Sequence, residues 1–155
     1  MHGLAEFVGL VGQRTWDKEL VLWVGSEAKL LPVLSGVHVD RLDLLDLFDG
    51  PPEQIDDDEV RQYLSRSLKK WLRATPRISD KRTVLIVRSA ALLARYHVGV
   101  REFYDWFCDD FAMVILLVEG VCAGVEWPEE VQCDSQRILD YFSEAGMVKR
   151  QFAAV

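Results

Sequence analysis

The sequence predicts an α/β protein, a single-domain three-layer sandwich whose mostly parallel sheet has four to five strands. The length of 155 residues fits one domain. Three short runs of Val, Ile and Leu, at residues 20–24, 83–87 and 113–118, are apolar without alternation, as expected of strands buried on both faces of a parallel sheet. Helical stripes lie between these runs, and this alternation is typical of a doubly wound sheet.

The composition is that of a folded chain. Half of the residues are hydrophobic and 28% are charged, which excludes intrinsic disorder and low-complexity structure. The longest apolar run, residues 111–118, is far shorter than the ~20 residues that a membrane-spanning helix needs. Glu6 follows Met1 closely, with no basic stretch before an apolar segment, so we expect no secretory signal, no membrane partner and a cytoplasmic location.

The first third of the chain predicts a helix before the first strand and a short strand after it. Residues 3–14 place four apolar side chains at helical spacing. Residues 37–39 follow Ser35 and Gly36 and predict a fourth, shorter strand, which gives way to a turn-rich stretch ending at residues 49–52. The apolar residues of the N-terminal helix are Leu4, Phe7, Val8 and Val11.

Two helices are expected between the later strands. Asp56, Asp57 and Asp58 precede an apolar stripe that closes before Pro76, and we interpret the aspartates as capping residues that compensate the helix dipole. An aromatic stripe from Val100 to Phe111 predicts a second helix. Trp106 falls outside the centre of that stripe, so we consider it as a partner contact or as ordinary edge packing. The first stripe comprises Val60, Tyr63, Leu64, Ser67, Leu68, Trp71 and Leu72.

The C-terminal part predicts one more helix and one more strand. Asp134 caps a helix with Ile138, Leu139 and Phe142 facing inward and Gly146 at its end, and residues 148–155 predict a last edge strand. We therefore divide the single domain into an N-terminal helix at residues 1–16, a core at residues 20–119 and a C-terminal extension at residues 120–155.

The charge of the chain is unevenly distributed. Residues 61–82 hold eight basic residues and one acid and are +7, so the rest of this chain of net charge −7 carries −14. Arg66, Lys69, Lys70 and Arg73 form a basic helix face that we predict to dock an acidic partner. The alternatives are an ordinary solvated helix face and a nucleic-acid contact through residues 61–82.

The nucleic-acid alternative would use aromatic side chains for base stacking. Trp71 and Tyr63 are available for stacking if they are exposed, but their helical spacing places both in the core stripe. The acidic balance of the whole chain also argues against non-specific nucleic-acid affinity.

Other site chemistries lack their signatures. Cys108, Cys122 and Cys133 offer neither a disulfide framework nor a zinc motif, so we expect buried or inert thiols and no metal. No serine stands in a G-x-S-x-G elbow. His97 lies in a loop before the aromatic helix, where a solvent-facing or helix-capping role is favoured over catalysis.

The end of the first predicted strand carries the most specific signal. In a doubly wound sheet, ligands bind beyond the carboxyl ends of the strands. There the sequence reads Gly25-Ser26-Glu27-Ala28-Lys29, which resembles the start of a P-loop. A second strand about 60 residues later and a further apolar strand follow in the order of RecA-like and AAA-like ATPases, so residues 20–119 resemble a P-loop NTPase core. The resemblance implies a nucleotide site at Gly25, Ser26 and Lys29.

The motifs of this core depart from those of an active enzyme. A working P-loop needs a second glycine and a lysine that reaches phosphate, but Leu30 and Leu31 stand at those positions. Glu27 adds a carboxylate where phosphate must bind. Arg88 and Ser89 replace the magnesium-linked acid and the catalytic glutamate, and phosphoryl transfer needs positioned positive charge and metal together. Glu119 is likewise anionic at the place of the polar sensor.

The chain is similar to the small P-loop accessory proteins of bacterial phage-exclusion (BREX) systems, which operate beside larger ATPases. The resemblance implies a non-catalytic interaction or regulatory subunit with a degenerate NTPase-like core, without a cofactor or catalytic residues of its own. Its partner is then a protein, such as a larger ATPase or another subunit of a defence complex. The enzyme-class alternative is an atypical nucleotide-binding protein that completes its site with a partner ATPase.

Overall fold

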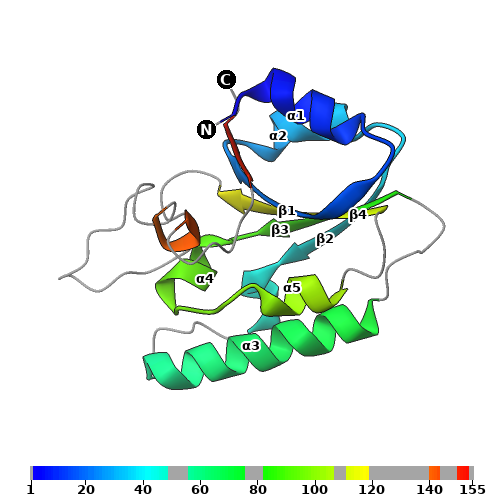
Figure 1. The fold of residues 1–155 in the computed structure, drawn as a ribbon. Helices are drawn as coiled ribbons and strands as arrows, with labels where there is room; N and C mark the ends of the chain where they lie inside the picture. The colour runs from blue at the N-terminus through cyan, green and yellow to red at the C-terminus, as the bar shows by residue number, and fades with distance from the viewer. Residues whose placement is uncertain are drawn as a thin grey trace.

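The computed structural model describes residues 2–48, 56–75, 82–106, 111–118, 140–143 and 150–153. Its five strands form a single all-parallel sheet in the order β2-β3-β4-β1-β5. Helices cover both faces, as Figure 1 shows, so the predicted α/β three-layer sandwich is confirmed. The strands are β1 (Trp16–Val24), β2 (His38–Asp43), β3 (Thr83–Arg88), β4 (Phe111–Val118) and β5 (Arg150–Ala153).

The three central strands are those that the apolar runs predicted. In β4 every residue from Ala112 to Val118 is buried, and in β3 burial extends from Thr83 to Val87. Strand β1 begins at Trp16, four residues earlier than predicted, and its register with β4 shifts between Trp16 and Glu19. The polar residues of this first part lack the apolar run on which the prediction relied.

One face of the sheet carries the smaller layer. It consists of α1 (Leu4–Val11), α2 (Glu27–Leu30) and the 3₁₀ helix η1 (Leu31–Leu34), whose buried side chains share a core with alternate residues of β1, β3 and β4. Helix α1 confirms the predicted N-terminal helix, but Val8 is half exposed, and Leu10 is buried in its place. The 3₁₀ helix η1 follows the four-residue α2 directly and contains Pro32. The proline explains why α2 is short, because proline disrupts an α-helix that would continue through it.

The opposite face carries the larger layer, seen below the sheet in Figure 1. It contains the 3₁₀ helix η2 (Leu44–Leu47), α3 (Asp57–Ala74), α4 (Ala91–Arg95) and α5 (Arg101–Trp106). Helix α3 begins directly after Asp56, as the aspartate run predicted, and it buries Val60, Leu64, Leu68 and Leu72 against the sheet. The Asp56 side chain makes no capping hydrogen bond, so the capping interpretation is wrong, while the acidic first turn fits the expected compensation of the helix dipole. Burying each leucine contributes roughly 1.5–3 kcal/mol, which outweighs any single surface interaction of this helix.

The predicted aromatic helix does not extend to Phe111. Among the described residues α5 spans Arg101–Trp106, and Phe111, which the stripe assigned to the helix, begins β4 instead. The spacing of the aromatic residues fits a helix by coincidence, whereas strand pairing with β1 and β3 decides the conformation from residue 111 onward.

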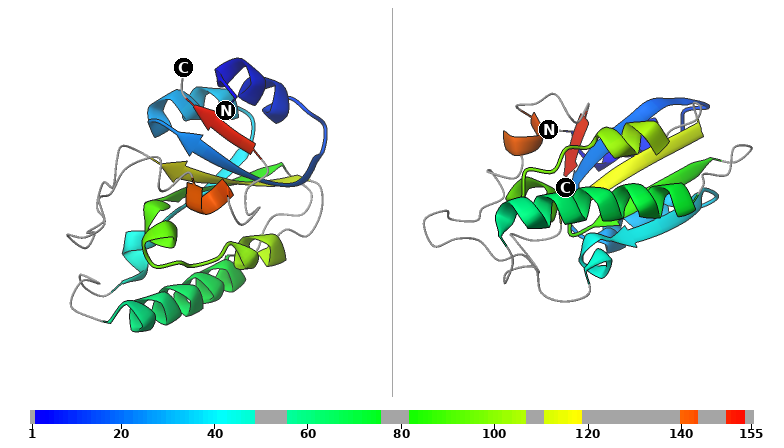
Figure 2. Two further views of the ribbon diagram at one scale, coloured as in Figure 1. Left: turned by 60° about the vertical axis from the view of Figure 1, so that its left-hand side comes forward. Right: turned by 90° about the horizontal axis from the view of Figure 1, so that it is seen from below.

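The structure describes only part of the C-terminal segment for which a helix and a strand were predicted. Residues 140–143 are helical and Phe142 is fully buried, while Asp134, Ile138, Leu139 and Gly146 lie outside the described residues. The predicted edge strand is present as β5, which pairs in parallel with β1. Phe152 of β5 packs against Phe7 of α1, and the two ends of the chain lie close together (Figure 2).

No helix of the described residues combines the length and the apolar character needed to cross a bilayer.

Candidate functional site

The sheet has a topological switch point between its neighbours β1 and β4. The chain leaves β1 through α2 and η1 on the face of the smaller layer. After β4, Phe142 packs against the opposite face. Where the connections of neighbouring parallel strands leave on opposite faces, ligands of doubly wound sheets bind at the carboxyl edge. The predicted strand-end residues therefore lie at the correct edge for a ligand site.

The loop after β1 is already engaged with the protein itself. Gly25, in a backbone conformation with φ 139° that favours glycine, donates its N–H to the carbonyl of Val118 at 3.1 Å. The carbonyl of Ser26 accepts a hydrogen bond from the Trp23 indole at 3.2 Å. Lys29 lies exposed on α2. The structure thus places Gly25 and Ser26 at the switch point, but the Gly25 N–H that a phosphate needs is bonded to β4.

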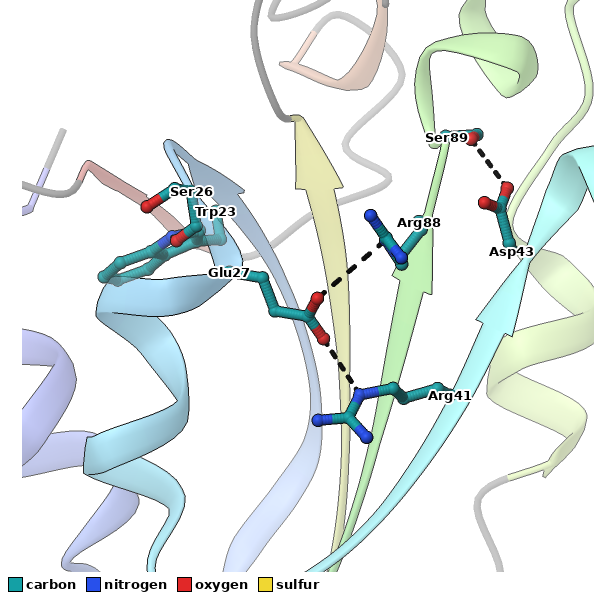
Figure 3. Close-up of polar contacts among 7 residues, drawn as sticks. All are labelled: Trp23, Ser26, Glu27, Arg41, Asp43, Arg88 and Ser89. Atoms are coloured by element: carbon teal, nitrogen blue, oxygen red, sulfur yellow. Dashed lines mark hydrogen bonds and ion pairs between the residues drawn. The ribbon is translucent and has the colours of Figure 1, made fainter. Parts of the chain in front are cut away.

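Glu27 dominates the polar contacts at this edge, as Figure 3 shows. Its carboxylate lies 3.0 Å from Arg41 Nε of β2 and 3.9 Å from Arg88 Nε at the end of β3. The Glu27 side chain is only 16% exposed, whereas both arginines are about half exposed. The protein therefore supplies its own anion to the two cations of this edge.

A second pair extends the cluster toward β2. Ser89 Oγ donates to Asp43 Oδ1 at 2.7 Å, and the same oxygen accepts the Leu45 N–H at 3.0 Å. Ser89 has a left-handed backbone, with φ 60°, which costs roughly 1–2 kcal/mol for a residue other than glycine. We call Glu27, Arg41, Asp43, Arg88 and Ser89 the switch-point cluster.

Phosphate binding is unfavourable at this cluster for three reasons. Helix α2 has four residues, so few peptide dipoles are aligned at its N-terminus. The Glu27 carboxylate would repel an incoming phosphate at short range. Asp43, held nearby by Ser89 and the Leu45 N–H, adds a second carboxylate to this edge and so further negative charge that opposes phosphate.

Sequence reasoning identified Glu27, Arg88 and Ser89 but missed Arg41 and Asp43. The predicted strand ended at Val39, whereas β2 continues to Asp43. Strand β2 lies at the edge of the sheet, where strands commonly carry charged residues and show no continuous apolar run. The sequence offered one signal for Arg41 and Asp43. They lie just before the apolar residues of η2, where the strand must end.

The basic residues of α3 lie on the outer face of the molecule. Arg66, Lys69, Lys70 and Arg73 are all exposed. None of the four forms a hydrogen bond or ion pair with any residue that the structure describes. We call these four residues the basic strip. Arg77 and Lys81, which extend the basic segment in the sequence, lie outside the described residues.

The like charges of the basic strip repel one another. Arg66 and Lys70 are four residues apart, as are Lys69 and Arg73, and each such pair destabilises a helix by about 0.2–0.5 kcal/mol. The helix dipole offsets this for Arg73 in the last turn. Arg66 lies two turns from the end, beyond the reach of that compensation.

Three aromatic residues named for partner or base contacts are engaged in packing. Trp106 is 6% exposed, and its indole N–H donates to the Thr75 carbonyl at 3.0 Å, so of the two alternatives for this residue the structure favours packing over a partner contact. Tyr63 stacks on Phe48, and Trp71 packs against the larger core. Tyr63 and Trp71 are therefore only partly exposed, and their packing leaves less ring surface for base stacking.

Of the remaining residues considered as site candidates in the sequence, the structure describes only some. His97 is exposed and has a left-handed backbone, with φ 55°. The three cysteines and Glu119 lie outside the described residues.

Comparisons with protein-family models, with curated proteins and with solved structures find nothing that matches this chain.

Proposed function

We propose that this protein is a non-catalytic interaction subunit that docks an acidic segment of a partner protein on the basic strip of α3. The observation that carries the proposal is the strip itself: four exposed cations, unpaired within the described chain and mutually repulsive, in a protein of net charge −7. An acidic partner relieves this repulsion and gains a complementary field that raises the association rate.

The switch-point cluster supports the non-catalytic part of the proposal. In the predicted P-loop-like arrangement, the phosphate-binding position follows β1. Here Glu27 stands at that position and pairs with Arg41 and Arg88. An internal carboxylate in this place disfavours phosphate binding, as a degenerate NTPase-like core would require. The partners that the resemblance implies are a larger ATPase or another subunit of a phage-exclusion complex.

Charge neutralisation tests the docking surface. We expect a variant with glutamine at positions 66, 69, 70 and 73 to lose capture of the native partner from a host lysate, because the attraction between strip and partner is electrostatic. The unmodified protein should lose the same partner as salt rises, and mass spectrometry should show an acidic stretch in it. Circular dichroism checks that α3 remains folded, and the charge-reversed variant with glutamate at the four positions should give a stronger loss.

Two results would contradict the proposal. Capture that is unchanged in the neutralised variant, with unchanged salt sensitivity, excludes the basic strip as the docking surface. Heat release or a thermal shift with millimolar ATP and magnesium would instead favour the nucleotide-binding alternative at Gly25, Ser26 and Lys29, since a bound ligand stabilises the native state.

A further inference from the structure

A groove with a cavity volume of about 370 Å³ lies beside the basic strip. Its two walls come from segments far apart in the sequence, namely α3 and the turn between α4 and α5. Arg66 belongs both to the groove and to the strip, so the two features are continuous. The lining residues are Arg61, Gln62, Ser65 and Arg66 of α3 and residues 97–99 of the turn.

The groove is lined by groups that suit an anion. Two arginines, a glutamine, a serine and His97 are among its lining residues, and no acidic residue is among the described ones. Arginine binds carboxylates with two parallel hydrogen bonds, and such charge-assisted bonds are about twice as strong as neutral ones. Arg61 pairs with the exposed Asp58 at 2.9 Å, and because such exposed pairs contribute little, a partner carboxylate can replace Asp58.

The walls of the groove are held in place by contacts outside it. Arg95 at the end of α4 donates two hydrogen bonds, of 2.9 and 3.2 Å, to the carboxylate of Asp57 in α3. The Tyr141 hydroxyl donates to the Val98 carbonyl at 2.8 Å, and its ring contacts His97 edge-on. Because these contacts hold the backbone of both walls before binding, little free energy is spent on ordering that backbone when a ligand binds.

We infer that this groove seats one carboxylate side chain of the partner's acidic segment, whose following acids lie along the basic strip. The inference rests on the proposed function and names its anchoring point. From Arg61 to Arg73 the helix rises about 18 Å at 1.5 Å per residue. An extended peptide covers that length with about five or six residues, so the partner is a short acidic stretch rather than a single anion.

Filling the groove without changing its charge tests this inference. Gly99 has open space around an added Cβ and lies outside the left-handed region, so Gly99→Leu narrows the groove without backbone strain. The probe is a fluorescein-labelled hexaglutamate peptide, and fluorescence anisotropy with the full chain gives its affinity. We expect Gly99→Leu to weaken binding about tenfold, the effect of losing one charge-assisted contact. Gly9→Leu is the matched control on the opposite layer, where an added Cβ also meets open space.

A second pair of variants keeps the test independent of how Gly99→Leu folds. Arg61→Gln should weaken hexaglutamate binding severalfold more than Arg14→Gln, an equal loss of charge at an exposed site after α1. Suppose that both groove variants bind hexaglutamate like their controls while neutralising the basic strip abolishes binding. The inference that the groove seats a carboxylate is then wrong, and the proposed docking on α3 is retained. If neutralising the strip has no effect, the proposed function itself fails. Tighter binding of a single-stranded oligonucleotide than of hexaglutamate would overturn the acidic-peptide assignment.

Discussion

Tyr141 and Tyr104 show how burial of single side chains sets a response to pH. Burial raises the pKa of the Tyr141 hydroxyl, which also donates to Val98. Burial, and secondarily the negative charge of Glu19, raises the pKa of Tyr104. In both cases the folded state favours the neutral phenol, because a phenolate would be poorly solvated.

The pH dependence follows from the sign of these shifts. An unfolded tyrosine loses its proton near pH 10, while the folded protein still holds it. The stabilisation is therefore complete below that pH and is lost as pH rises through the folded pKa. We expect the free energy of unfolding, measured by urea denaturation, to fall above about pH 10, and to fall less steeply in Tyr141→Phe. An identical alkaline slope in the variant would contradict this account.

Single residues also show where sequence reasoning stops. The apolar positions of α3 were predictable because their spacing is a property of one helix. The burial of Trp106 was not, since its indole bonds to Thr75, 31 residues away in the sequence. Arg41 and Arg88 likewise meet Glu27 only after three strands have been placed in one sheet.

At the scale of elements, Arg82 fastens α1 to the sheet. Its guanidinium donates to the carbonyls of Val11, the last residue of α1, and of Gln13 just after the helix, and it lies 4.2 Å from the centre of the Trp16 ring. Partial burial lowers the pKa of Arg82 through desolvation. Its hydrogen bonds to these carbonyls therefore offset part of the free-energy cost of removing the charged guanidinium from water. One side chain thereby joins α1, β1 and the start of β3.

Replacing Arg82 should loosen α1 before the rest of the fold. We expect Arg82→Gln to lower the free energy of unfolding by about 1–3 kcal/mol, as is usual when bonds to a charged group are lost. Hydrogen exchange of the α1 amides should accelerate more than that of β3 and β4. Arg14→Gln, which removes an exposed arginine nearby in the sequence, is the control. Equal exchange in the two variants would show that α1 is held by its apolar packing alone.

Elements were predicted best where one physical signal dominated. The continuous apolar runs identified β1, β3 and β4, and the aspartates with the apolar stripe identified α3. The last part of β2 was missed because an edge strand carries charges, and α5 was overextended because β4 overrides its aromatic spacing.

At the scale of the whole molecule, the two layers separate two kinds of surface. Helices α3 and α1 lie on opposite sides of the sheet (Figure 2). The basic strip and the groove belong to the α3 side. The basic strip was predictable because its four residues belong to one helix. The groove was not, since residues 61–66 and 97–99 meet only through the packing of α3 against the turn after α4.

The sheet order makes folding depend on the distant end of the chain. Strand β1 pairs only with β4 and β5 in the described sheet, and both come after residue 110. We expect a truncated chain of residues 1–110 to lack a cooperative thermal transition by circular dichroism, because β1 and β3 then have no strand between them. A sharp transition in this fragment would show that α3 and β2–β3 form an independent unit.

The position of β1 also bears on how the protein is made. Its sheet neighbour β4 leaves the ribosome about 95 residues later, which at typical synthesis rates is a delay of about 5–20 s. During that interval the apolar strand β1 has no partner strand, and the hydrogen-bonding groups along both of its edges are unpaired. Translation speed and chaperone supply should therefore influence the yield of soluble protein more than the modest size of the chain would suggest.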